Sequence, residues 1–144
     1  MAANIPITRE YFMKRLTELC LKSGLAGFPK DETSLHILLK SAVLLMGQPD
    51  QLNEKEVNAK LEVWVREVAQ SGGMDRVSLR RELVDRGYLS RSADGSVYQI
   101  ARPGPCPELF DEIIEQLDIS QEIEIAREEL ARRKREYLEK SRGV

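Results

Sequence analysis

Apolar residues recur along most of the chain at intervals of three and four positions, which is the spacing of amphipathic helices. This pattern predicts helices at about 8–22, 31–46, 53–69, 75–86, 107–117 and 119–140. In the second of them apolar side chains cover most of the circumference, so we expect it to be the central buried helix. The first is expected to begin at the cap Thr8 and to bury Phe12 and Leu16.

The third helix has the clearest start signal in the sequence. Asn53 and Glu56 have the spacing of a capping box, with Asn in the role that Ser or Thr usually takes. Leu52 before the cap and Val57 after it have the spacing of a hydrophobic staple. These signals place the start of the helix directly after Asn53.

A turn at 70–73 separates the third and fourth helices, and two short strands follow at 89–91 and 96–100. Ala93-Asp94-Gly95 between the strands is a strong hairpin signal. Helix, turn, helix and hairpin in this order are typical of a winged-helix domain. We therefore expect a mainly α fold with a small β-hairpin, in which a winged-helix (helix-turn-helix plus wing) core occupies 28–102.

Helical extensions are expected on both sides of this core. Residues 1–27 form the N-terminal helical extension and residues 103–144 the C-terminal one. The boundary at 102–107 contains three prolines, which cannot continue a helix or a strand. The sequence thus predicts one domain with a helical extension on each side.

Two runs of sequence carry a resemblance to a known family. They are LNEKEVNAKL (Leu52–Leu61) and LRRELVDRGYLSRSADGSVYQI (Leu79–Ile100). With the lead-in FPKD…LHILLKSAVLL, residues from about 28 to 100 resemble a bacterial domain-of-unknown-function family, number 2087 in that series. The resemblance implies a small winged-helix-like domain, found alone or appended to bacterial transcriptional regulators. It implies no established activity.

Charge is distributed unevenly along the chain. The formal net charge is −2, whereas a dedicated DNA-binding protein usually has a basic surplus. Residues 75–102 nevertheless contain six arginines against four acidic residues, while 106–124 contain seven acidic residues and no basic one. The acidic segment should lie away from any bound DNA and could instead attract a basic partner.

Catalytic, nucleotide-binding and metal-binding motifs are not found in the sequence. We therefore predict no enzyme activity, no metal and no cofactor. The longest apolar run, Ile37–Met46, is too short to cross a membrane, so no membrane partner is expected. Cys20 and Cys106 are far apart in the sequence and form no CxxC pair. We therefore expect inert, reduced thiols and a cytoplasmic protein. His36, the single histidine, is expected at the edge of a buried helix.

The fourth helix and the hairpin hold the candidate nucleic-acid-binding residues, since the second helix of a helix–turn–helix enters the major groove. The candidates are Ser78, Arg81, Arg86, Ser90 and Arg91. A solvated surface is the competing interpretation for these arginines, because the outward arc of the helix has one base and two acids. Tyr98 and Trp64 could stack on bases, but their positions favour the core.

Arg80 falls on the apolar side of the fourth helix, where an unpaired arginine would be very costly. Glu56 and Asn58 on the preceding helix are its candidate partners in a structural polar pair. The functional alternative is that Arg80 reaches a ligand or a phosphate.

One apolar seam runs along the last helix. It consists of Ile119, Ile123, Ala126, Leu130 and Tyr137. The seam could pack on its own domain or pair with a second chain, as in a homodimer. Two functions therefore remain open: a DNA-binding or transcription-regulatory module that binds double-stranded DNA, or a protein-interaction or oligomerisation module, with an unknown partner, that binds none.

Overall fold

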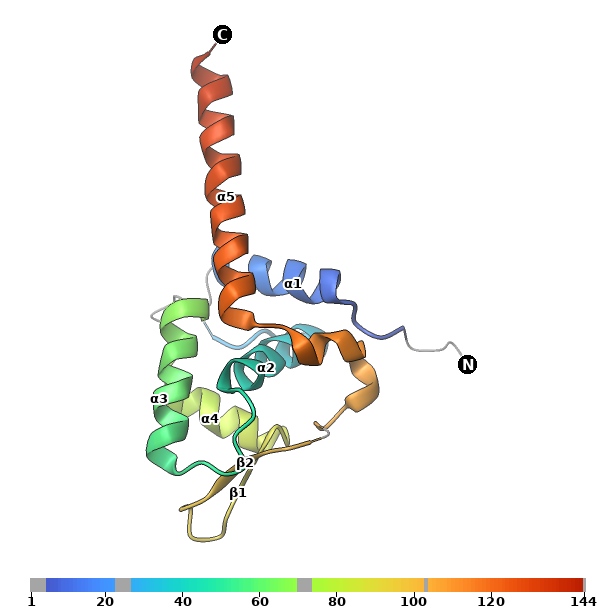
Figure 1. Ribbon diagram of the computed structural model, residues 1–144, viewed down its shortest axis with the longest axis vertical. Helices are drawn as coiled ribbons and strands as arrows, with labels where there is room; N and C mark the ends of the chain where they lie inside the picture. Colours follow the sequence, from blue (N-terminus) through green and yellow to red (C-terminus); the bar gives the residue numbers. More distant parts are fainter. Residues whose placement is uncertain (1–4, 23–26, 70–73, 103, 144) are drawn as a thin grey trace.

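The computed structural model describes residues 5–22, 27–69, 74–102 and 104–143. Its helices are α1 (Arg9–Thr17), α2 (Glu32–Met46), α3 (Glu54–Trp64), α4 (Arg76–Asp85) and α5 (Ile119–Arg142). Its strands are β1 (Leu89–Arg91) and β2 (Tyr98–Ile100). The hairpin and the free end of α5 lie at opposite ends of the molecule (Figure 1). The fold is mainly α with a small β-hairpin, as the sequence predicts; the expected turn at 70–73 lies outside the described residues.

Helix α2 is the centre of the fold, and this prediction is confirmed. Ten of its fifteen residues are buried, and α1, α3 and α5 all pack against it. The helix begins where Asp31 accepts a hydrogen bond from the Ser34 backbone N–H at 2.9 Å. It ends at Gly47, whose φ of +83° is the left-handed conformation that glycine adopts without strain.

Single π-helical turns continue two of the helices. Glu18–Lys22 follows α1 and Val65–Ala69 follows α3, so the helical segments extend as far as the sequence predicts. Phe12, Leu16 and Cys20 are buried on the inner side of the first segment. The apolar spacing was sufficient to find both segments, because the two π turns pack against each other and keep Cys20, Val68 and Ala69 buried.

The start of α3 has the expected capping box. The Asn53 side chain accepts from the Glu56 backbone N–H at 2.7 Å, and the Glu56 carboxylate accepts from the Asn53 backbone N–H at 2.9 Å. Leu52 and Val57, the two residues of the predicted staple, are both buried. The box satisfies two of the backbone donors that a helix start leaves open.

The hairpin pairs Leu89 with Ile100 and Arg91 with Tyr98 in antiparallel register. A bridge between Leu52 and Tyr98 adds a third short strand segment, directly before α3. The resulting order, in which α2, this segment, α3, α4 and the hairpin follow one another, is consistent with a winged-helix core.

The second strand is shorter than the predicted 96–100, because Asp94 organises a wider turn. Its Oδ1 accepts from the Ser92 hydroxyl at 2.7 Å and from the Ser96 backbone N–H at 3.0 Å. These bonds hold Ser96 in the turn, and β2 begins at Tyr98. They also lower the pKa of the Asp94 carboxyl to about 2, through the Ser92 hydroxyl first.

The predicted helix at 107–117 is wrong. Two short 3-10 turns, Pro107–Leu109 and Glu112–Gln116, stand there instead, with extended Phe110 between them. The Ile7 backbone N–H donates to the Leu109 carbonyl at 2.7 Å, and the Asp111 N–H donates to the Ile7 carbonyl at 2.9 Å. This parallel bridge to a segment a hundred residues earlier takes the backbone groups that a helix would have used.

One hydrophobic core joins the central region to both flanking segments. Phe12 and Leu16 from the N-terminal segment and Phe110, Ile114 and Ile123 from the C-terminal one are buried in the same cluster as α2. Phe12 and Phe110 meet edge to face, with ring centroids 5.9 Å apart. The outer half of α5 extends beyond this core, and its described residues from 131 onward are all exposed (Figure 1).

Candidate nucleic-acid interface

Helix α4 is positioned by Asp75 at its start. The Asp75 carboxylate accepts from the Ser78 backbone N–H at 2.8 Å and from the Ser78 hydroxyl at 2.9 Å. These bonds, the backbone one first, lower the pKa of the Asp75 carboxyl below its usual value. Ser78 is exposed, but its hydroxyl proton is already donated within the helix cap.

Arg81 and Arg91 are the candidate residues that remain available to a ligand. Both are exposed, and neither forms an ion pair with any residue that the structure describes. Arg81 lies on α4, and Arg91 ends β1 with its guanidinium over Gly95 of the turn. Ser90 is exposed beside Arg91, and its hydroxyl donates a long bond of 3.5 Å to the Gln99 carbonyl.

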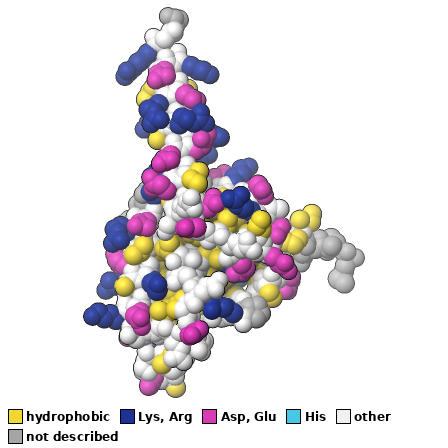
Figure 2. Space-filling model, viewed as in Figure 1, with side chains coloured by type: hydrophobic (Ala, Val, Ile, Leu, Met, Phe, Trp, Pro, Cys, Tyr) yellow, Lys and Arg dark blue, Asp and Glu magenta, His cyan; other side chains and the backbone are white. Residues whose placement is uncertain are grey.

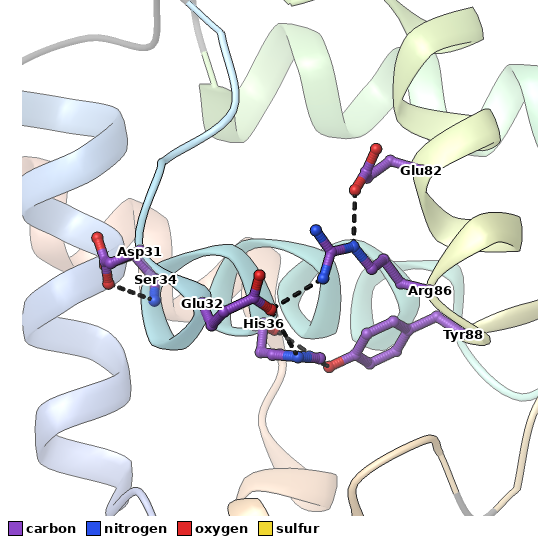
Figure 3. A network of polar contacts seen from close by, with 7 residues as sticks. All are labelled: Asp31, Glu32, Ser34, His36, Glu82, Arg86 and Tyr88. Carbon is purple, nitrogen blue, oxygen red and sulfur yellow. Dashed lines mark hydrogen bonds and ion pairs between the residues drawn. The ribbon is translucent and has the colours of Figure 1, made fainter.

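Arg86, in contrast, is held by two carboxylates (Figure 3). Its Nε donates to Glu82 Oε1 at 2.9 Å and its Nη1 donates to Glu32 Oε2 at 2.8 Å. Arg86 therefore ties the end of α4 to the start of α2. A DNA phosphate could bind this guanidinium only by competing with two carboxylates that are already in place.

The same network includes the single histidine. His36 Nδ1 lies 2.8 Å from the Tyr88 hydroxyl, and His36 Nε2 lies 3.7 Å from Glu32 Oε2 (Figure 3). Burial lowers the pKa of His36 below its usual value, and this outweighs the opposite effect of Glu32. Burial also raises the pKa of the Tyr88 hydroxyl, which stays protonated. His36 thus lies at the edge of α2, half-buried, where the sequence placed it.

Arg80 finds its partners on α3, though not both of those predicted. Its guanidinium donates to the Asn58 side chain and lies 3.2 Å from Glu54 Oε1. Glu56, the other predicted partner, instead turns back to the capping box at Asn53. Glu54 is one position into the helix, where its side chain faces α4. The triad locks the start of α3 against α4.

Trp64 and Tyr98 belong to the core. Both side chains are fully buried, and the Trp64 indole N–H donates to the Ser41 hydroxyl at 2.9 Å. Neither ring can stack on a base without unfolding of the core. The aromatic residues of the winged region therefore hold the fold together rather than contribute to a binding surface.

The apolar seam of α5 divides into two parts. Ile119 and Ile123 are buried in the core of their own chain, and Ala126 and Leu130 are half-buried. Tyr137 is 71% exposed on the projecting half. Of the five seam residues predicted for a dimer, the first two are therefore occupied by contacts within the chain.

Sequence reasoning missed several polar contacts of this region. Glu32 and Arg86 are 54 positions apart and His36 and Tyr88 are 52 apart, so no local spacing signals either pair. No group of three His, Cys, Asp or Glu side chains that could hold a metal ion occurs among the described residues. Likewise, no helix in the described part of the chain is long and apolar enough to cross a membrane.

A family model of uncharacterised proteins conserved in bacteria (DUF2087) matches residues 24–100. The match covers more than half of the chain and includes α2, α3, α4 and the hairpin. It begins four residues before the start that the sequence resemblance suggested. No curated protein and no solved structure matches the chain. The chain therefore belongs to the bacterial family of uncharacterised proteins DUF2087.

Proposed function

We propose that this protein is a DNA-binding or transcription-regulatory module that presents α4 and the β1–β2 hairpin to double-stranded DNA. The observation that carries the proposal is the pair of exposed arginines on these two elements, Arg81 and Arg91, which have no carboxylate partner in the described chain. In winged-helix proteins the second helix of the motif and the hairpin contact DNA. The order of elements in this chain is consistent with that fold, which supports the proposal.

The other arginines on α4 and at its C-terminal cap each have a carboxylate partner within the protein. Arg76 pairs with Glu62, Arg80 with Glu54, and Arg86 with Glu32 and Glu82. With Arg81 and Arg91 as the main phosphate contacts, the logarithm of the binding constant should fall with the logarithm of salt concentration with a slope of roughly −2. Affinity for a random sequence is accordingly expected to be weak.

Fluorescence polarisation with a random-sequence duplex, at low and moderate salt, tests this proposal. Arg81→Ala and Arg91→Ala should each weaken binding and reduce the magnitude of the salt slope by about 1. Arg135→Ala is the matched control, since Arg135 is also exposed and belongs to the outer half of α5, which projects away from the hairpin (Figure 1). Absence of binding at low salt, or an equal loss in all three variants, would overturn the proposal.

The second candidate function is a protein-interaction or oligomerisation module. The outer half of α5 favours this second function, because it projects from the rest of the protein and exposes the apolar side chains of Tyr137 and Leu138 (Figure 1). Six basic and two acidic side chains lie between 132 and 142, and Figure 2 shows the basic ones gathered on this projecting end. Light scattering across a range of protein concentrations tests it: a constant monomer mass would exclude self-association as that function.

A further inference from the structure

A cavity of about 520 Å³ lies between the second half of α2, the base of the hairpin and the segment from Gly104 to Leu117. Val43, Leu44 and Ile100 form an apolar wall on one side, and Pro105 and Phe110 form one on the other. The lining also has polar parts, which include the charged residues Lys40, Arg102, Asp111, Glu112 and Glu115. Small-molecule sites in proteins have volumes in this range and combine apolar walls with a few polar groups. The cavity is therefore large enough to enclose a ligand.

Among the charged residues that line this cavity, Lys40 is the buried one. Its side chain leaves α2 and is buried, with only 7% of the residue exposed. The ammonium lies against the Glu115 carboxylate and 5.7 Å from the centre of the Phe110 ring. A buried ammonium requires an anionic partner, because the loss of its hydration is otherwise not compensated.

Glu115, the partner of Lys40, is much more exposed to solvent than Lys40 itself. The Glu115 side chain is 62% exposed and belongs to the short 3-10 turn Glu112–Gln116. The carboxylate can return to water at low cost, whereas the ammonium stays inside the cavity on a helix of the core. Another carboxylate can thus replace Glu115 at Lys40 while its apolar body fills the cavity.

We propose that this cavity is a binding site for a small monocarboxylate with an aromatic or branched apolar body. The carboxylate binds the Lys40 ammonium in place of Glu115, and the body packs against Val43, Leu44 and Ile100. The site is separate from the exposed arginines of α4 and the hairpin, and it does not depend on the proposed DNA binding.

Titration of the ¹⁵N-labelled full chain with 3-phenylpropionate, followed by NMR, tests the site without DNA. Saturable shifts should cluster on amides around the cavity, such as those of Ile100 and Gly104. The neutral analogue 3-phenylpropanamide has nearly the same shape and should bind at least about tenfold more weakly, because it cannot form the charge-assisted bond. Equal affinity for the two compounds, or no saturable shift with either, would overturn the proposal.

Three variants assign the binding to Lys40. Lys40→Met should weaken 3-phenylpropionate binding at least about tenfold and leave the cavity walls in place. Glu115→Gln should bind as tightly as the parent protein or more tightly, because the competing carboxylate is gone. Lys55 is an exposed lysine on α3, so Lys55→Met is the matched control and should change nothing. Equal effects of the two lysine substitutions, or a loss of binding in Glu115→Gln, would contradict the assignment.

Cys106 gives an independent readout that does not use the variants. Its thiol is free, half-buried and part of the cavity lining. A bound 3-phenylpropionate should slow modification of Cys106 by a disulfide reagent, while 3-phenylpropanamide at the same concentration should not. Unchanged modification at a saturating concentration would place the ligand elsewhere.

Discussion

At the scale of single residues, His36 shows how burial and a neighbouring charge compete. The ring is half-buried against Tyr88, and burial lowers its pKa more than Glu32 raises it. We expect the His36 pKa to lie below the usual value of about 6.5. Because the chain has one histidine, a pH titration of its ring protons by NMR gives this value without assignment problems. A pKa at or above 6.5 would show that Glu32 dominates.

The lowered pKa has a consequence for stability. Well above about pH 6.5 His36 is neutral in both the folded and the unfolded chain, so it contributes no pH dependence there. As the pH falls below that value the unfolded chain takes up the proton first, and the free energy of unfolding decreases until the folded-state pKa is passed. Urea unfolding at pH 7.5 and 5.5 should show a smaller loss in His36→Gln than in the parent protein. Equal losses would contradict this.

The two cysteines should differ in reactivity. Cys20 is buried, and burial raises its pKa to about 12, so its reactive thiolate is scarce at neutral pH. Cys106 is only half-buried. A colorimetric disulfide reagent should therefore modify one thiol per native chain and both after unfolding.

Cys106→Ser is the control for this thiol count. The variant should show no reactive thiol until it is unfolded. Rapid modification of its remaining cysteine in the native state would mean that the α1 segment opens readily, contrary to its place in the core.

At the scale of elements, the Asn53 capping box should contribute measurably to stability. Asn53→Ala removes the side-chain acceptor for the Glu56 backbone N–H and should lower the free energy of unfolding by about 1 kcal/mol. Asn53→Ser keeps an acceptor and should cost much less. Urea unfolding of the two variants checks the difference. Equal losses would mean that packing of Leu52 and Val57, rather than the cap, fixes this helix start.

Local signals explain why most elements could be predicted from the sequence. The caps Thr8, Asp31 and Asn53 lie within a few positions of the helices they start, and each accepts the expected backbone N–H. The helix predicted at 107–117 failed because its competitor, the bridge between Ile7 and Phe110, is distant in sequence. Apolar spacing cannot distinguish a helix from extended backbone that is held by a remote strand.

In the candidate site, too, local features could be predicted from the sequence, whereas contacts between distant residues could not. Helical phase was enough to put Arg81 on the outside of α4 and Arg80 toward α3. It could not show that Glu32 holds Arg86, or that Glu54 rather than Glu56 pairs with Arg80. Which arginines remain available is decided by tertiary contacts. The sequence therefore predicted on which face of α4 each arginine lies, but it did not predict which arginines lack a carboxylate partner.

At the scale of the whole molecule, the flanking segments are parts of one core rather than appendages. Phe12, Phe110 and Ile123 come from the two extensions and are buried together with α2. The Lys40 cavity lies between the family-matched region and the C-terminal segment, so it needs both. A fragment limited to residues 24–100 would lose these contacts and part of the cavity wall.

The two halves of α5 should have very different effects on stability. Deleting 132–144 removes only residues that are exposed where the structure describes them, and should change the free energy of unfolding by no more than about 0.5 kcal/mol. Ile123→Ala shortens a side chain that is 1% exposed in the core and should cost roughly 2–5 kcal/mol. Urea unfolding of the truncated protein and of Ile123→Ala, each at two protein concentrations, measures the two losses. A large loss on truncation that grows with protein concentration would mean that the projecting helix is stabilised by a second chain, as the protein-interaction function requires.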